Sequence, residues 1–191
     1  MFNDLITSKS RVRLLGVFLL DPAAMYHVRE LVRRTQEEIN AVRRELALLE
    51  KKGILTREPR ANRVYYFLSK SYPFYFDLLS MGVKTFGLGA EILRNRGKLG
   101  KIKFAMFSGK FARRLKKEPD DVDFLVVGTV VLPELAALVR NEERRLSAEI
   151  NYTAMSDEEF AFRKSKRDPF ILRILSGSRV MLLGDEEDML S

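Results

Sequence analysis

Residues Phe107–Gly128, FSGKFARRLKKEPDDVDFLVVG, place a glycine turn, a basic segment and a pair of aspartates between apolar segments. Asp121 and Asp123 are two residues apart, so on an extended strand both carboxylates would project from one face. Paired carboxylates are hard oxygen ligands that suit a divalent cation such as Mg²⁺. The backbone N–H groups of the turn Ser108–Lys110 suit the phosphates that such a cation carries. The stretch therefore predicts a metal and phosphate site between two strands.

The composition is typical of a folded protein without disulfides. At 191 residues, the chain can form one large domain or two small ones. Its 46% hydrophobic residues suffice for a buried core. The absence of cysteine excludes disulfides and thiolate metal sites. The apolar run Leu14–Leu20 stops at Asp21 and Pro22, far short of a membrane span. We therefore expect a soluble, cytoplasmic protein with no membrane partner.

The formal net charge is +8, and most of the excess lies near the N-terminus. Residues 1–70 hold 14 Lys/Arg and 8 Asp/Glu, a net charge of +6. Residues 71–191 hold 20 and 18, a net charge of +2. Positive charge concentrated in one part of a chain is expected of a segment that binds a polyanion. A basic surface that only contacts solvent is the alternative, and charge alone does not separate the two.

Apolar spacing predicts three helices in the N-terminal third. Residues at helical spacing cover about Leu5–Leu20 and, more briefly, about Val28–Arg34. Thr35 lies three residues before Glu38, which is a capping-box spacing and predicts a third helix over Gln36–Lys52. The apolar face of this third helix is formed by Ile39, Val42, Leu46 and Leu49.

A β-hairpin is predicted after these helices. Ile54–Thr56 and Val64–Leu68 contain strand-forming residues and flank the polar turn Pro59–Asn62. Three helices followed by a basic hairpin define a winged helix-turn-helix arrangement. This arrangement would occupy residues 1–70.

The same region resembles the winged-helix domains of bacterial and archaeal transcription regulators. The resemblance covers about residues 8–70 and includes VREL at Val28–Leu31 and LALLEKKG at Leu46–Gly53. It implies that Gln36–Lys52 is the recognition helix, which enters the major groove of double-stranded DNA by its N-terminal half. Winged helices also serve as protein-interaction modules, which stays open as an alternative.

The polar residues of the helix and the hairpin have suitable chemistry for DNA. Gln and Asn suit adenine, Arg suits guanine, and basic hairpin residues suit phosphate or the minor groove. Glu37 and Glu38 would repel phosphate near the helix start. An exposed polar face that only contacts solvent is the alternative. The candidate DNA-binding residues are Gln36, Asn40, Arg43, Arg44, Arg60, Asn62 and Arg63.

Residues 71–99 are predicted to be a helical connector. Ser71–Phe76, SYPFYF, is an aromatic cluster, and Asp77–Arg94 continues as a mostly apolar helix with three glycines. Base stacking is one interpretation of the aromatic side chains, but a packed seam between domains or protomers is the interpretation we favour. Because helix-turn-helix proteins usually bind two half-sites, we expect a homodimer.

Residues 100–191 are predicted to form a small α/β domain with a mixed sheet, because strand and helix patterns alternate. The overall fold class expected is therefore α+β, with a winged helix-turn-helix followed by this domain. The predicted strands are Ile102–Phe107, Val122–Val127, Ala148–Tyr152 and Val180–Leu183. The predicted helices are Leu132–Leu146, Asp157–Lys166 and Pro169–Leu175, before the acidic tail Asp185–Asp188.

Over about residues 100–185 the chain resembles the minimal nucleotidyltransferase domains of the polymerase-beta-like superfamily. Gly109 matches the turn glycine of that family, Phe111–Arg113 matches the segment that comes after it, and Asp121–Asp123 matches its metal-binding acid pair. The resemblance implies Mg²⁺ bound with a nucleoside triphosphate. The implied metal ligands and catalytic residues are Asp121 and Asp123, and the implied nucleotide-binding residues are Ser108, Gly109, Lys110 and Arg113.

Departures from the family pattern weigh against catalysis. Lys110 stands where the family has a small serine, and Arg114 replaces a usual glycine. The family takes a third acid from a later strand, where this chain offers Glu149 and Asn151 on one face. Asn151 is neutral and cannot act as a base, so Glu149 is the doubtful third catalytic acid.

The sequence supports two function hypotheses. The first is a DNA-binding transcription regulator whose second domain is catalytically degraded and serves as a nucleotide/Mg²⁺ sensor or an assembly module. The second is an active Mg²⁺-dependent nucleotidyltransferase that acts on a protein, RNA or small-molecule acceptor, with a toxin–antitoxin system as one context. The lone His27 is interpreted as structural, since no second His or Cys is present to build a zinc site.

Overall fold

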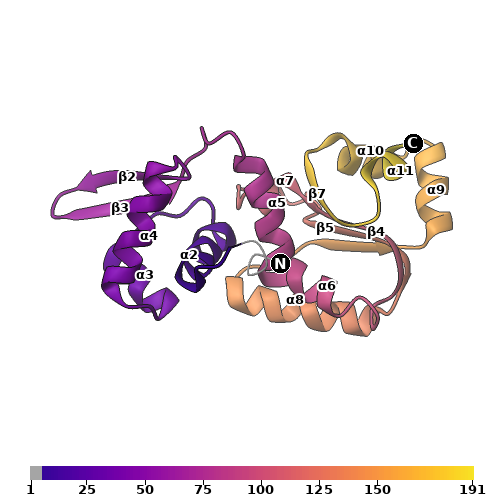
Figure 1. Cartoon of the computed structure of the whole chain (residues 1–191). Coiled ribbons are helices and arrows are strands. Elements are labelled where there is room, and N and C mark those ends of the chain that lie inside the picture. The colour runs from indigo at the N-terminus through magenta and orange to yellow at the C-terminus, as the bar shows by residue number, and fades with distance from the viewer. Residues whose placement is uncertain (1–5) are drawn as a thin grey trace. The chain divides into compact units, whose positions relative to one another are not determined.

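The computed structural model describes residues 6–191, and the chain divides into two compact units after Phe86. Each unit is described by itself, with the element labels of Figure 1. The residues 71–99 predicted as a connector are divided between the units: helix α5, Tyr75–Thr85, belongs to the first and helix α6, Gly87–Arg94, to the second. No helix among the described residues is long and apolar enough to span a membrane.

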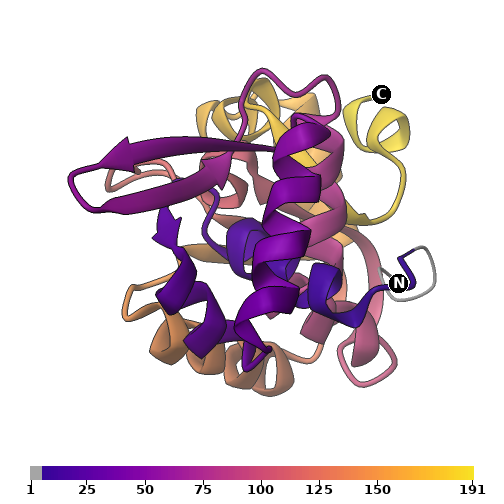
Figure 2. The same ribbon diagram turned by 60° about the vertical axis from the view of Figure 1, so that its left-hand side comes forward.

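The first unit contains helices and a small antiparallel sheet in the order predicted for a winged helix. Strand β3 lies between β1 and β2, and β2 pairs with β3 as a hairpin with Arg60 opposite Arg63. Figure 2 shows this hairpin extending beyond α3 and α4. Besides α5, the elements are α2 Lys9–Leu20, β1 Tyr26–His27, α3 Val28–Thr35, α4 Ile39–Lys51, β2 Leu55–Arg60 and β3 Arg63–Leu68.

The core of the first unit forms where α2 packs against α3, α4 and α5. Leu14 and Phe18 of α2 are fully buried, as are Leu31 of α3 and Leu46 of α4. The predicted apolar face of the third helix is therefore confirmed at its centre. Ser8 caps α2 by accepting a hydrogen bond from the Arg11 amide, and the predicted helix start at Leu5 lies outside the described residues.

The predicted start of the third helix is wrong. Helix α4 begins at Ile39, and its N-cap is Glu38, whose carboxylate accepts hydrogen bonds from the Asn40 and Ala41 amides. Thr35 is the buried last residue of α3, and its hydroxyl donates to the Leu31 carbonyl at 2.7 Å. Because that hydroxyl already has a partner in α3, no capping box forms. Gln36 ends α3 in the left-handed region, with φ 55°, and lies in the turn.

The second unit is built on a sheet with strand order β6-β5-β4-β7. Strand β5 runs parallel to β6, whereas β4 is antiparallel to both β5 and β7, so the predicted mixed sheet is confirmed. Its strands are β4 Gly100–Ser108, β5 Phe124–Val130, β6 Tyr152–Met155 and β7 Arg179–Leu183. Besides α6, its helices are α7 Gly109–Ala112, α8 Leu132–Leu146, α9 Asp157–Ser165, α10 Pro169–Ser176 and α11 Glu186–Leu190.

One face of this sheet is covered by the last three helices. Their buried residues Phe160, Ile171 and Met189 pack into one cluster with alternate residues of the strands. Figure 1 shows α8 along the other side of the sheet. The strand residues of the cluster are Phe104, Met106, Leu125, Val127 and Met155.

Two predicted strand starts are displaced toward the C-terminus. The predicted strand Val122–Val127 begins at Phe124, and the predicted strand Ala148–Tyr152 is replaced by β6 at Tyr152. The reason for the second shift is the end of α8. Ser147 adopts a left-handed conformation with φ 51°, and the Ile150 amide donates to the Glu143 carboxylate at 2.9 Å. The paired aspartates therefore precede β5 and Asn151 precedes β6.

Close packing of α5 on α2 gives a stability prediction. A Cβ added at Gly82 would lie 2.7 Å from Leu19 Cβ, so Gly82→Ala forces the two helices apart. We expect thermal unfolding at a lower temperature and a loss of about 1–3 kcal/mol, because overpacking outweighs the gain in helix propensity. The control is Gly97→Ala, where an added Cβ meets no atom within 4 Å. Equal melting temperatures for the two variants would contradict this packing.

Candidate functional site

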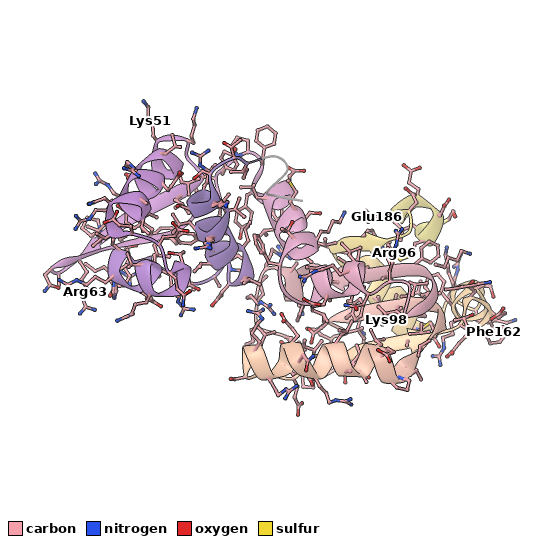
Figure 3. The ribbon with its side chains drawn as sticks, turned by 60° about the horizontal axis from the view of Figure 1, so that its bottom comes forward. Lys51, Arg63, Arg96, Lys98, Phe162 and Glu186 are labelled. Atoms are coloured by element: carbon pink, nitrogen blue, oxygen red, sulfur yellow. The ribbon has the colours of Figure 1, made fainter. Side chains whose placement is uncertain are left out.

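The first unit has a basic groove of about 780 Å³ between α3, the start of α4 and the hairpin. Four arginines line it: Arg29, Arg33, Arg43 and Arg63. Figure 3 shows Arg63 at the tip of the hairpin, pointing away from the ribbon. We call this surface the arginine groove, and it is lined by His27, Val28, Arg29, Arg33, Ile39, Arg43, Asn62, Arg63, Val64 and Tyr66.

The groove arginines differ in their ion pairing from most other arginines of this unit. The four groove arginines are exposed and form no ion pair with an acidic side chain of residues 6–191. Other arginines of the unit are paired at 2.6–2.9 Å. These pairs are Arg11 with Glu45, Arg13 with Glu37, Arg34 with Glu30, Arg57 with Glu50 and Arg60 with Glu58. Of the arginines in this unit that form no ion pair with an acidic side chain of residues 6–191, all but Arg44 therefore line the groove.

The structure divides the predicted DNA-binding residues among four places, of which the hairpin position of Arg60 is the last. Arg43, Asn62 and Arg63 line the arginine groove. Asn40 and Arg44 are exposed on α4 outside its lining, and Gln36 lies in the turn before α4.

Arg60 lies on the hairpin over the Tyr65 ring, 5.9 Å from its centroid. The hydrogen bond that Arg60 donates to Glu58 raises the pKa of the guanidinium, so this arginine carries a compensated charge. The sequence analysis missed Arg29 and Arg33, although their spacing of four residues places them on one helix face.

The acidic residues near the start of α4 do not face the groove as free charges. Glu37 accepts hydrogen bonds from Arg13 at 2.7 Å and from Ser10 at 2.6 Å, and Glu38 caps α4. His27 has a structural role, since its Nδ1 accepts from the Glu30 amide at 3.3 Å and caps α3. Burial raises the pKa of the Tyr66 hydroxyl, so the phenol in the groove is neutral. The predicted repulsion of phosphate by Glu37 and Glu38 is thus reduced by their partners.

The second unit has a smaller pocket, of about 290 Å³, at the end of β4 and the start of α7. It brings together Ser108, Gly109, Lys110, Arg113 and Asp121 of the predicted site. It adds Phe170, Arg173 and Ser178, which come from far along the chain and carried no local signal. We call it the aspartate pocket, and its remaining lining residues are Met106, Asp120, Val122, Ile174 and Gly177.

Each predicted metal-binding carboxylate is held by a lysine. Asp121 Oδ2 lies 2.7 Å from Lys110 Nζ and also accepts a hydrogen bond from the Glu118 amide at 2.7 Å. Asp123 Oδ2 lies 2.6 Å from Lys117 Nζ and accepts from the Asn151 amide at 2.9 Å. The Asp123 side chain is only 2% exposed and does not line the aspartate pocket.

The electrostatic consequence is clearest at Asp121. The hydrogen bond from Lys110, with a further one from the Glu118 amide, holds the pKa of this carboxyl below its usual value of 3.8. Both contacts favour the charged form. Asp121 is therefore ionised at neutral pH and paired with a cation from its own chain.

The glycine turn is anchored within the fold. The Gly109 amide donates to the Ser178 carbonyl at 2.6 Å, and a Cβ at Gly109 would lie 2.0 Å from Ser178 Oγ, so no other residue fits. Ser108 Oγ accepts from the Phe111 amide at 3.1 Å as the cap of α7. Arg113 donates to Ser178 Oγ at 3.1 Å and to the Gly109 carbonyl at 2.9 Å. These contacts join the turn to the residues before β7.

The third acid sought in the sequence does not join the pair. Glu149 is exposed, and its backbone carbonyl accepts from Lys117 Nζ at 2.7 Å. Asn151 uses its side-chain amide as a donor to the carbonyls of Asp121 at 3.2 Å and Pro119 at 3.4 Å. An aspartate could not donate these bonds. Within residues 6–191, no group of three or more His, Asp or Glu side chains is arranged to hold a metal.

Comparisons with known proteins add little to this geometry. No family model matches the chain, and no curated protein shows significant similarity. Among solved structures, the chain is similar to reduced HlyU from Vibrio cholerae N16961, with a TM-score of 0.35 and 21% sequence identity. The likeness covers 44% of this chain and 80% of that chain. A TM-score this low supports no argument about function, which must be inferred from the described residues themselves.

The Lys110–Asp121 pair predicts a pH effect on stability. Because the folded state lowers the pKa of Asp121, the pair stabilises the fold above pH 3.8, and this contribution is lost as the pH falls through the lowered value. Asp121→Asn should cost at most about 1 kcal/mol at pH 7, since the pair is partly exposed. Urea unfolding at pH 7 and below pH 4 should show the two proteins converging. Glu149→Gln is the control, and a similar convergence for it would contradict a specific role for Asp121.

Proposed function

We propose that the protein is a DNA-binding transcription regulator that contacts double-stranded DNA with the arginine groove of its first unit. The observation that carries this proposal is the separation of charges. The four groove arginines are exposed and without an acidic partner among residues 6–191, whereas five of the other arginines of the unit are paired. Uncompensated cations gathered in one concave surface raise its affinity for a polyanion.

The groove suits the docking geometry of a winged helix. The N-terminal half of α4 would enter the major groove, where Asn40, Arg43 and Arg44 meet base edges. Asn62 and Arg63 on the hairpin would contact phosphate or the minor groove. Gln36 would approach from the turn, and Arg29 and Arg33 of α3 would contact the backbone. Arg60 contributes less, because Glu58 compensates its charge.

The second unit is proposed to serve as a nucleotide sensor or an assembly module of a homodimeric regulator. The aspartate pocket supports the sensor, because Lys110, Arg113 and Arg173 place cationic groups around one cavity beside Phe170 and Ile174. Cations suit phosphate, and apolar side chains suit a base. A ligand there would regulate DNA binding only if it bound two conformations with different affinity.

The second candidate function is nucleotidyl transfer. It is favoured by the meeting of Ser108, Gly109, Lys110, Arg113 and Asp121 in one pocket. Such an enzyme would use Asp121 and Asp123 for Mg²⁺ and transfer a nucleotidyl group to a protein, RNA or small molecule, with a toxin–antitoxin system as one setting. Incubation with each labelled nucleoside triphosphate and Mg²⁺ tests this. We expect no label transfer, whereas transfer lost in Asp121→Asn and Asp123→Asn would replace the sensor with an enzyme.

The DNA-binding proposal predicts a selective effect of arginine substitutions. Arg33→Ala with Arg43→Ala should weaken binding to a duplex from the chain's own promoter at least about 10-fold, because two uncompensated cations are lost. The dependence of binding on salt should become less steep by about 1 for each lost phosphate contact. Fluorescence anisotropy at several salt concentrations measures both quantities.

The matched control replaces arginines that are already paired. Arg57→Ala, which removes the partner of Glu50, and Arg11→Ala, which removes the partner of Glu45, lower the net charge as much as the groove substitutions do, but at positions outside the groove lining. These variants should bind as the wild type does within about 2-fold. Equal losses for groove and control variants would show that general charge, and not the arginine groove, determines binding.

A further inference from the structure

Two lysines hold the paired aspartates at the start of β5, and their placement bears on metal binding. We propose that Lys110 and Lys117 take the place of divalent cations, so that the aspartate pair is a metal-independent structural site that excludes Mg²⁺. The inference concerns the second unit alone and does not depend on DNA binding. It also predicts that any ligand of the aspartate pocket binds without a metal.

The groups around one oxygen of each carboxylate, Oδ2, do not fit a cation. Oδ2 of Asp121 faces the Lys110 ammonium and the Glu118 amide, both at 2.7 Å. Oδ2 of Asp123 faces the Lys117 ammonium at 2.6 Å and the Asn151 amide at 2.9 Å. All four neighbours present hydrogen atoms, whereas Mg²⁺ demands oxygen ligands in octahedral geometry. The two ammonium groups therefore repel a cation beside these oxygen atoms, and the amide N–H groups do not ligate one.

The charges are balanced without a metal. Each carboxylate faces one ammonium group, so the pair carries no net charge to attract a divalent ion. Lys117 Nζ also donates to the Glu149 carbonyl at 2.7 Å, which fixes the ammonium group in place. Asn151 supplies amide hydrogens where a third carboxylate would be required.

Burial makes one of these pairs structural. Asp123 is 2% exposed, and a carboxylate so buried is strongly destabilising without a partner. Lys117 supplies that partner from the loop before β5 and binds the segment before β6 at the same time. The Lys117–Asp123 pair thus links the loop before β5 to the segment before β6. In a catalytic site, a metal would have to bind between these two segments.

The first test measures Mn²⁺, a paramagnetic substitute for Mg²⁺, on the full chain. Titration calorimetry and electron paramagnetic resonance should detect no saturable Mn²⁺ binding to the wild type. Neither Mg²⁺ nor EDTA should change its melting temperature. Saturable Mn²⁺ binding that is lost in Asp121→Asn would overturn the proposal.

The second test removes the lysines. Lys110→Ala with Lys117→Ala should lower the melting temperature by at least about 5 °C, because Asp123 loses its partner. Mn²⁺ should then bind saturably and restore part of the loss. The control Lys116→Ala changes an exposed lysine of the same loop and should alter neither quantity. A folded double variant that fails to gain Mn²⁺ binding would also overturn the proposal.

A double-mutant cycle keeps the proposal testable if the double lysine variant does not fold. Lys117→Met and Asp123→Asn should each lower the melting temperature. Their combination should lower it by clearly less than the sum, because the double variant leaves neither charge without its partner. Additive losses would mean that Lys117 does not neutralise Asp123, and the substitution of lysine for a cation would be refuted.

Discussion

The buried carboxylate of Asp123 is the constraint on which the second unit depends. A charge that is 2% exposed must be compensated, and the chain compensates it with Lys117 and the Asn151 amide. The backbone of the same residue joins the strands: the Ser108 amide donates to the Asp123 carbonyl, and the Asp123 amide donates to the Asn151 carbonyl. The end of β4 and the starts of β5 and β6 therefore meet at one residue. Loss of the Lys117 partner would therefore disturb the ends of these strands as well as a local contact.

Charge pairing also matters in the first unit, where it leaves several arginines without an acidic partner. Acidic residues there are used within the fold, as Glu37 with Arg13 and Glu38 at the cap of α4 illustrate. Four arginines without an acidic partner among the described residues lie together on α3, the start of α4 and the hairpin tip. Net charge alone predicted a basic segment, and the pairing pattern adds where unpaired arginines gather within it.

The sequence predicted the features that periodicity encodes. The burial of Val42, Leu46 and Leu49 and the mixed sheet were both expected from residue patterns. It could not predict which partner a polar group takes. Thr35 has the spacing of a cap, yet its hydroxyl bonds to α3. Lys117 lies in an irregular loop, where no repeating pattern of residues indicates that its ammonium group contacts Asp123.

The two lysine–aspartate pairs also differ in what a ligand could reach. Lys110 is 44% exposed and lines the aspartate pocket, whereas Lys117 and Asp123 do not line it. An anion that entered the pocket would therefore meet Lys110, Arg113 and Arg173, and it would compete with Asp121 for the Lys110 ammonium group. The Lys117–Asp123 pair would not take part in this competition, because neither residue lines the pocket. The two aspartates of the motif therefore differ: Asp123 is buried within the fold, and Asp121 lines a pocket.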